Sequence, residues 1–363
     1  MKNLKTQGLI LIDVDVAALN NAGKSTTSSF DNAVATKTIR KNGIKYTYVS
    51  GQAWRHWWRD TLQKHFKWEL SPITRESKIA FTEANPIKYA DDDIFFYMRA
   101  AKAEILDKEG KVVKDSKGKP KMENVTVTRV SPLKNSAIVS VASVSTEENW
   151  SSMARQEGDS VPYSKEEYSA IMKGMFALDL THAGTFSNYN KTGFKNLTDV
   201  LRLEALENGA TEIADPFVKN SNGEAMQLIR LPKEIRTKRV TEAIEALKFI
   251  SGGAMQTSNM ADVTPKFIIL STMNVGNHPF THIFNSGINK QTVKFNADGL
   301  AEVLSDYKDQ FKGDIYIGVR NGFLDREDVN ALEAVVSTFD YVHLKTVNEA
   351  IDSYCIDIKN LIE

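Results

Sequence analysis

One segment combines side chains that bind phosphate with a helix that can hold them. Residues 48–62 read YVSGQAWRHWWRDTL. At about 100° per residue, Gln52, Arg55 and Arg59 share one face of a helix, opposite a tryptophan-rich stripe. Ser50 stands at the N-cap position, where free backbone N–H groups and the helix dipole favour an anion. The pattern is typical of a phosphate-binding site, although an amphipathic helix with solvated arginines looks the same.

A second segment, residues 251–260, is small, polar and interrupted by two methionines (SGGAMQTSNM). It follows a predicted helix and precedes the strongly apolar run KFIILSTM. One interpretation is a flexible connection. The functional alternative is a loop whose backbone approaches RNA closely, with Met255 as an apolar wedge against the bases.

A third segment, residues 20–26, ends in Gly-Lys-Ser and partly resembles a phosphate-binding P-loop. The P-loop pattern requires glycine five residues before Gly23, and that position is Ala18. No apolar strand ending in aspartate follows convincingly. The sequence therefore argues against a P-loop ATPase.

Candidate metal ligands are few and poorly placed. His278 and His282 have the spacing of a helical ligand pair, but Pro279 disrupts the helix start and no carboxylate completes the site. Asp13 and Asp15 share one side of a predicted strand, where a solvated face is the simpler interpretation. Residues 91–93 are three aspartates, which we interpret as the acidic start of a helix or strand. We expect no metal site and no cofactor.

Strands, hairpins and helices alternate irregularly along the chain. The predicted strands include Gly8–Val16, Ala137–Val144, Met175–Leu180, Lys266–Met273 and Asp314–Val319, and Asn42-Gly43 predicts a hairpin turn. Residues 17–29 are predicted to be a loop, and residues 107–124 an exposed excursion. The predicted helices are Gln52–Lys67, Lys195–Asn208, Lys238–Ile250, Arg326–Phe339 and Val347–Leu361. This order indicates an α+β fold rather than a doubly wound one, and it suits a ferredoxin-like core with long insertions.

Composition excludes several classes of protein. The chain has 363 residues, 42% hydrophobic and 25% charged, which argues against extensive disorder. No run of about 18 apolar residues predicts a membrane span, and a lone cysteine, Cys355, excludes an internal disulfide framework. We expect a soluble cytoplasmic protein. The net charge is zero, yet residues 1–67 carry +7 and residues 298–363 carry −8, which can mark one face for a polyanion.

Five segments in this order resemble the backbone subunit of the CRISPR-associated Cascade complex, in its DevR-type branch (the CRISPR-associated autoregulator group of type I-B systems). They span about residues 8–275. They are the strand leading into Ala18-Leu19-Asn20-Asn21, the helix start at Ser50 to Arg59, DDDIFFYM at 91–98, RVSPLKNSAIVS at 129–140, and the helix–Gly-Gly-Ala–strand element at 243–270. Trp57-Trp58 is bulkier than the usual aliphatic pair, which implies a repacked palm.

The resemblance implies one elaborated domain over residues 1–363. Its RRM-like (ferredoxin-like) palm would comprise mainly residues 1–70 and 260–345, with a helical fingers insertion over 71–240 and a thumb loop over 250–262. Copies would polymerise head to tail along one CRISPR RNA, beside other Cascade subunits, and target DNA would be read through guide pairing. The residues that would contact RNA are Asn21, Lys24, Lys37, Ser50, Gln52, Arg55, Arg59, Gly253, Met255, Gln256 and Thr257.

Two other functions remain open from the sequence. A type III-like backbone subunit would cleave target RNA with an aspartate in the loop after the first strand, and Asp31 is the acid nearest that loop. A single-stranded RNA-binding protein outside CRISPR systems would show the same basic and aromatic segments. We expect a non-catalytic protein.

Overall fold

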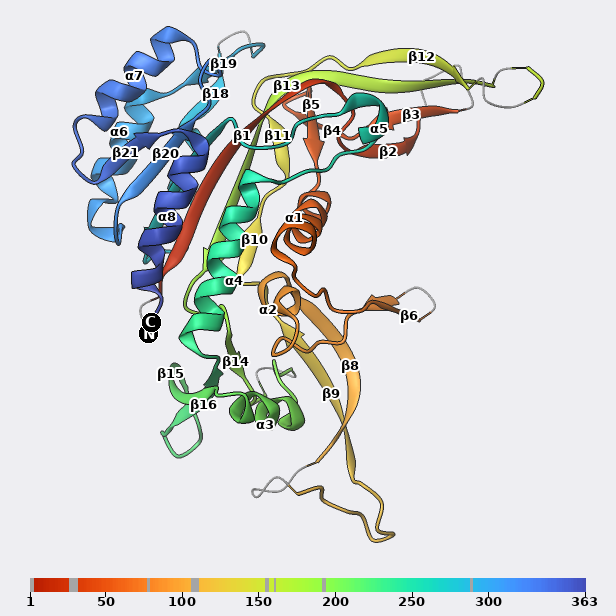
Figure 1. Ribbon diagram of the computed structural model, residues 1–363, viewed down its shortest axis with the longest axis vertical. Helices are drawn as coiled ribbons and strands as arrows, with labels where there is room; N and C mark the ends of the chain where they lie inside the picture. The colour runs from red at the N-terminus through yellow and green to blue at the C-terminus, as the bar shows by residue number, and fades with distance from the viewer. Residues whose placement is uncertain are drawn as a thin grey trace.

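The computed structural model describes residues 3–25, 32–76, 79–105, 111–153, 157–159, 161–190, 194–287 and 290–363. Within these residues, twelve strands form one large mixed sheet (Figure 1). Its main path runs in the order β21 (Val342–Lys345), β20 (Ile315–Val319), β17 (Phe267–Met273), β1 (Lys5–Ala17), β13 (Val161–Asp179), β11 (Ile138–Ser140), β5 (Ile44–Val49) and β4 (Thr38–Lys41). The strands beside this path are β2 (Asn21–Lys24), β3 (Ala33–Thr36), β10 (Leu133–Asn135) and β12 (Glu147–Met153).

The first strand is the axis of the sheet. β1 pairs antiparallel with β13 on one side and with β17 on the other. Its alternate side chains enter two different cores: Ile10 and Ile12 pack on one face, and Leu9 and Leu11 on the other. A strand buried on both faces needs a nearly continuous apolar run, which the sequence GLILIDV supplies.

Helices cover both faces of this sheet. The first core contains side chains from α1 (Gly51–Phe66), α4 (Lys233–Glu245) and α8 (Val347–Leu361). The second contains side chains from η2 (Pro279–His282), α6 (Ala297–Asp306) and α7 (Arg326–Val336). The tryptophan stripe of α1 is part of the first core, where Trp54 and Trp58 stack with ring centroids 5.4 Å apart. The Trp58 indole N–H donates to the Ala243 carbonyl at 2.6 Å, which ties α1 to α4.

The connections between the central strands follow a regular order. The neighbours β17, β1, β13 and β11 are all antiparallel. α1 lies in the chain between β1 and β11, and α4 lies between β13 and β17. Because both helices pack into the same core, they cover the same face of these four strands. The expected mixture of strands and helices is confirmed.

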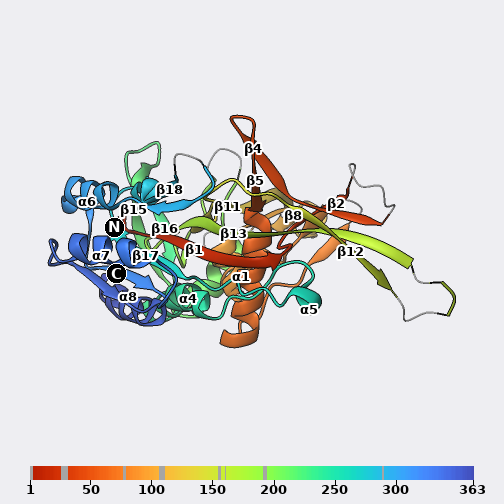
Figure 2. The ribbon, with the colours of Figure 1, turned by 90° about the horizontal axis from the view of Figure 1, so that it is seen from above.

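Several elements project from the sheet. β12 and the first half of β13 form a long arm (Figures 1 and 2). Two further hairpins pair β6 (Thr74–Glu76) with β7 (Ile79–Phe81), and β8 (Tyr97–Glu104) with β9 (Met122–Arg129). A three-stranded sheet of β14 (Thr185–Ser187), β16 (Ala225–Arg230) and β15 (Thr211–Lys219) packs with α3 (Asp199–Glu207). The remaining elements are α2 (Ala90–Phe95), α5 (Gln256–Asn259), β18 (Phe284–Ser286), β19 (Val293–Phe295), η1 (Ala246–Lys248) and η3 (Lys308–Gln310).

The structure confirms some predicted elements and corrects others. The hairpin at Asn42-Gly43 forms between β4 and β5, with positive φ at both residues, and α8 has the predicted limits. The predicted loop over 17–29 is partly wrong, because residues 21–24 form β2 and pair with β3. The predicted strand Met175–Leu180 is only the end of the 19-residue β13.

The helical starts and the fingers prediction also need correction. The helix predicted to begin at Lys195 begins at Asp199, after its Thr198 cap, and the helix predicted to begin at Lys238 begins at Lys233. In the described part of residues 71–240, strand residues outnumber the helical residues of α2, α3 and α4, so this range is not the mainly helical insertion that was predicted. Runs that consist only of β-branched residues, such as VTVT at 125–128, favour strands over helices.

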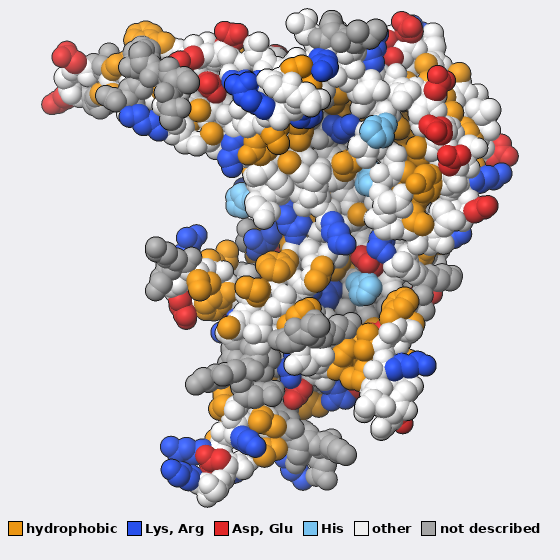
Figure 3. Space-filling model, turned by 180° about the vertical axis from the view of Figure 1, so that it is seen from behind, with side chains coloured by type: hydrophobic (Ala, Val, Ile, Leu, Met, Phe, Trp, Pro, Cys, Tyr) orange, Lys and Arg blue, Asp and Glu red, His pale blue; other side chains and the backbone are white. Residues whose placement is uncertain are grey.

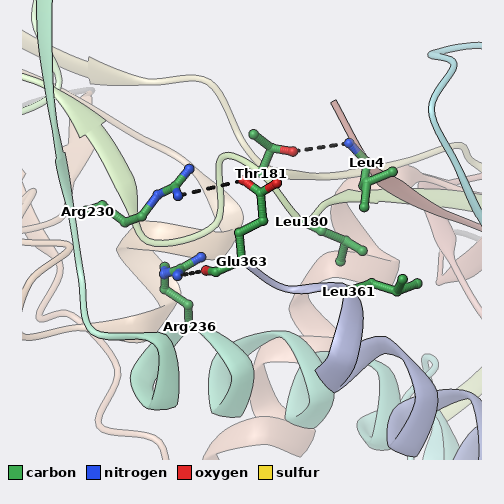
Figure 4. Close-up of a pocket in the computed structure, with 7 residues that line it drawn as sticks. All are labelled: Leu4, Leu180, Thr181, Arg230, Arg236, Leu361 and Glu363. Carbon is green, nitrogen blue, oxygen red and sulfur yellow. Dashed lines mark hydrogen bonds and ion pairs between the residues drawn. The ribbon is translucent and has the colours of Figure 1, made fainter. Parts of the chain in front are cut away.

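The two ends of the described chain lie side by side (Figures 1 and 4). Leu4 donates its backbone N–H to Thr181 Oγ1 at 3.1 Å, and Arg236 donates to the Glu363 carbonyl oxygen. Burial, with a smaller contribution from the charge of nearby Arg230, lowers the pKa of Arg236 to about 10. These residues enclose a cavity of about 10 Å³, which is room for one water molecule at most. Among the described residues, no helix is long and apolar enough to cross a membrane.

Candidate nucleic-acid interface

The candidate interface begins where β1 bends. The pairing of β1 with β13 shifts register between Val14 and Ala17, and Val16 has a φ of 41°. Such a bulge kinks the strand and often re-aims the residues that follow it. Val16 donates its N–H to Ser169 Oγ at 3.0 Å, which fixes the bulge to β13. The chain then turns through the buried Leu19 to Asn20.

Asn20 and Leu19 join three segments that are far apart in the sequence. Lys37 donates its backbone N–H to the Asn20 carbonyl at 2.9 Å. Ser50 donates its backbone N–H to Asn20 Oδ1 at 3.0 Å, just before α1 begins. Ala254 donates its N–H to the Leu19 carbonyl at 2.9 Å. The predicted RNA-contacting segments around residues 20, 37, 50 and 254 therefore meet at one end of β1.

The loop of residues 251–261 is folded against this end of the sheet (Figure 2). A Cβ on Gly252 would lie 2.2 Å from Trp57 Cγ, so only glycine allows this close approach. Gly253 has a φ of +114°, and Met255 is in the left-handed region just before α5. The Gln256 amide donates to the Gly252 and Ala261 carbonyls, which closes the loop on itself.

The apolar side chain that this loop exposes most is not the one predicted. Met255 is partly buried, whereas Met260 is 84% exposed. Both methionines have left-handed backbone angles and flank the single turn of α5. Thr257 lies between them and is exposed. Sequence reasoning missed Met260 because both methionines occupy similar polar contexts in the chain.

Arg55 is not presented to solvent as the helical-face argument expected. Its guanidinium donates to the Leu133 carbonyl at 2.7 Å, to Asn135 Oδ1 at 2.9 Å and to Ser131 Oγ at 2.9 Å. It also donates to the Phe95 carbonyl. Burial, with a smaller contribution from the charge of Arg59, lowers the pKa of Arg55 to about 10. This arginine therefore fastens α1 to the end of α2 and to β10.

Arg59 is engaged as well, but less completely. It lies 2.5 Å from Asp91 Oδ2, and its side chain is 23% exposed while that of Asp91 is buried. Asp91 also accepts the Ser71 backbone N–H at 2.9 Å. A cavity of about 210 Å³ lies beside this pair. Its lining consists of Gln52, Arg55, His56, Arg59, Thr82, Asp91, Phe95 and Phe96.

The three aspartates at 91–93 occupy the first turn of α2, as predicted, but all are buried. Asp93 binds Arg129 from β9 and Arg239 from α4, at 2.5 and 2.8 Å. Arg129 also donates to the Thr185 and His182 carbonyls at 3.0 and 2.7 Å. The segments 91–98 and 129–140 that carry the family resemblance thus form one polar network with α1.

The predicted contact residues differ in whether their side chains bind other groups of the protein. Lys37, Gln52 and Thr257 form no side-chain hydrogen bond or ion pair within the part of the chain that the structure describes. By contrast, Ser50 Oγ caps α1 by accepting the Ala53 N–H at 3.3 Å, and the two arginines and Gln256 bind protein groups. Asn21 and Lys24 lie on β2, where Asn21 Oδ1 is buried and has no hydrogen-bond partner among the described residues.

The alternative sites receive little support from geometry. His278 and His282 lie at a 3₁₀ turn rather than on one helical face, and His278 Nε2 lies 2.9 Å from the Gly8 carbonyl oxygen. Burial lowers the pKa of His278. Asp13 and Asp15 are exposed on β1. Across the described ranges, no group of three or more His, Cys, Asp or Glu side chains could hold a metal ion. Asp31 lies outside the described residues.

Charge is segregated on the surface as well as in the sequence. Figure 3 shows Lys and Arg side chains across the middle of one face, while Asp and Glu gather along the edge formed by the C-terminal α6–α7 region. This is the region of the −8 segment. A polyanion would therefore be attracted to the middle of this face and repelled from that edge.

Comparison with families of known proteins gives one match. Residues 10–293 match the family described as "CRISPR-associated negative auto-regulator DevR/Csa2", which covers more than three quarters of the 363 residues. A search of curated proteins returned no match.

One solved structure has a similar fold. One chain, described as "CRISPR RNA-guided surveillance complex, pre-nicking", has a TM-score of 0.50 and 9% identity, covering 97% of this chain and 99% of that one. Another, described as "CRISPR RNA-guided surveillance complex", has a TM-score of 0.47 with the same identity and coverage. At this identity the likeness concerns the fold alone.

Proposed function

Because the chain belongs to the DevR/Csa2 family of CRISPR-associated proteins, we propose that it is a non-catalytic backbone subunit of a type I-B Cascade surveillance complex. It binds the spacer of the CRISPR RNA without reading its sequence. Copies polymerise head to tail along that RNA beside other Cascade subunits, and target DNA is recognised through guide pairing. The outcome is antiviral defence.

One observation carries the RNA-binding part of this proposal. The segments around Asn20, Lys37, Ser50 and Ala254 meet at one end of β1 through hydrogen bonds of 2.9–3.0 Å, which backbone N–H groups donate to the Leu19 and Asn20 carbonyls and to Asn20 Oδ1. The surface they form offers a lysine, amides, hydroxyls and a glycine-rich backbone. Such groups bind phosphates and sugars rather than base edges, so they suit a subunit that follows any guide.

The arrangement of the central strands supports an RRM-like palm. The order β17-β1-β13-β11, with α1 and α4 on one face, is the order of a ferredoxin-like unit. The folded loop of residues 250–262 is then the thumb. The β12–β13 arm and the segregated charges of Figure 3 provide surfaces for contact between successive copies.

The test is RNA binding by the purified protein at several salt concentrations, with two single-stranded RNAs of unrelated sequence. We expect both RNAs to bind alike and binding to weaken with salt. Lys37→Gln should weaken both to the same degree and lower the salt slope by about one unit, since one phosphate contact is lost.

Lys359→Gln is the matched control, because this exposed lysine lies near the end of α8. It should leave affinity and slope unchanged. Absence of RNA binding by the unmodified protein, or a preference of Lys37→Gln for one RNA over the other, contradicts the proposed function.

A further inference from the structure

Phe96 has an unusual backbone. It follows α2 with φ 123° and ψ 145° and is 51% exposed. Seven other non-glycine residues in the described chain have positive φ, but all lie near 40–60°, in the left-handed region. Among these residues, Phe96 alone lies close to a region used almost only by glycine, where any other residue is strained. A phenylalanine there is unfavourable for stability.

The two residues beside Phe96 explain why its side chain points outward. Phe95 is buried, and its carbonyl accepts from Arg55. Tyr97 is also buried, and its hydroxyl donates to the Asn196 carbonyl at 2.5 Å. With both neighbours anchored inward, the chain between them must turn its middle residue outward. The turn needs only a backbone that tolerates positive φ, so the fold itself does not require an aromatic ring.

The ring of Phe96 borders the cavity beside α1. Polar groups from Gln52, His56, Arg59 and Thr82 surround it. The volume of about 210 Å³ is below the range of about 300–1,000 Å³ that encloses a drug-sized ligand. It therefore suits one flat group whose remainder stays outside. An exposed aromatic face beside cationic and amide groups is how proteins hold bases of single-stranded nucleic acid.

We propose that Phe96 is a stacking platform for one unpaired base of a single-stranded RNA, with Gln52, His56 and Arg59 as polar contacts around that nucleotide. The inference rests on the proposed function, because the RNA must reach α1. Stacking accepts every base, so it is compatible with a subunit that does not read sequence. The backbone strain at Phe96 is then retained for binding rather than for folding.

The experiment compares four proteins on one labelled single-stranded RNA and on the same RNA carrying abasic sites. We expect Phe96→Leu to bind the intact RNA roughly 5- to 100-fold more weakly, the loss typical of one stacked base. Phe96→Tyr should bind like the unmodified protein. Phe217→Leu is the control, since this 76% exposed phenylalanine lies on β15. On the abasic RNA, the unmodified protein and Phe96→Leu should bind equally.

Stability gives an independent readout. Phe96→Gly relieves the positive φ, so its urea midpoint should equal or exceed that of the unmodified protein while its RNA affinity falls. If the unmodified protein binds RNA and Phe96→Leu binds it equally well, the stacking proposal is wrong and the proposed function stands. If the unmodified protein binds no RNA, both are wrong. If Phe96→Leu loses a protein partner but not RNA, this surface docks protein, which also overturns the proposal.

Discussion

The carboxylate of Asp93 and the guanidinium of Arg129 lie 2.5 Å apart in the interior, with side-chain exposures of 0% and 3%. The other Asp93 oxygen lies 2.8 Å from Arg239, which is also buried. Asp93 further accepts the Gly184 N–H at 3.1 Å. One carboxylate therefore joins α2, β9, α4 and the start of β14, and two buried cations depend on it.

Asp93→Ala should lower the free energy of unfolding by about 3–5 kcal/mol. The substitution leaves two guanidiniums buried without their counter-charge, and breaking a buried ion pair has costs of this size. Urea unfolding followed by tryptophan fluorescence measures it. Glu212→Ala is the control, because Glu212 pairs with Arg202 at a partly exposed site and its loss should cost less than about 1 kcal/mol. Equal effects of the two substitutions would contradict the role of Asp93.

Gly252→Ala should destabilise the protein by about 1–3 kcal/mol and displace the loop of residues 251–261. The added Cβ would fall 2.2 Å from Trp57 Cγ, and core side chains absorb such overlap only by shifting. A changed tryptophan emission spectrum and a lower melting temperature are the readouts. Gly276→Ala is the control, because a Cβ added at Gly276 would have no atom within 4 Å. It should change neither the tryptophan emission spectrum nor the melting temperature.

Lys173 should make stability depend on pH. Burial, with a smaller contribution from the charge of Lys41, lowers its pKa from 10.5 to about 8. Between these values the folded protein holds fewer protons than the unfolded chain, so stability rises with pH from about 8 to 10.5. The unfolding free energy of the unmodified protein minus that of Lys173→Met should therefore become more positive as pH rises across this window. If the difference in unfolding free energy for Lys173→Met does not change with pH, the lowered pKa of Lys173 is wrong.

With a guide RNA and Mg²⁺, the purified protein should leave complementary RNA intact, because we propose a non-catalytic subunit. Gel analysis of end-labelled target RNA measures this, with and without chelator. Regularly spaced cleavage that disappears in Asp31→Ala would instead establish the ribonuclease function.

Local patterns were enough to predict α1. Its cap, its limits and its buried tryptophans follow from a period of 3.6 residues and the serine at its start. The same pattern predicted that Arg55 and Arg59 face outward together. It could not predict what they meet, since the partners of Arg55 lie 40 to 80 residues away in the chain. Only the folded sheet brings α2 and β10 to that side of the helix.

The elements that sequence reasoning missed depend on pairing rather than on burial. β13 was predicted only over its apolar end, whereas its first half, residues 161–167, is polar and held by the partner strand β12. β2 is a short and mostly exposed strand, and it forms because β3 lies beside it. Hydrophobic alternation does not report such strands, because their stability comes from backbone hydrogen bonds to distant segments.

The central position of β1 also determines the order of assembly on the ribosome. Its two neighbours are residues 170–179 and 267–273, so neither flank can be covered until those segments have been made. At about 5–20 residues per second, β17 emerges on the order of 10–50 s after β1. β1 has two open edges until residues 170–179 have been made, and one open edge until residues 267–273 follow. The sheet around β1 can therefore be completed only late in synthesis, and an unpaired edge of β1 is a site of aggregation until then.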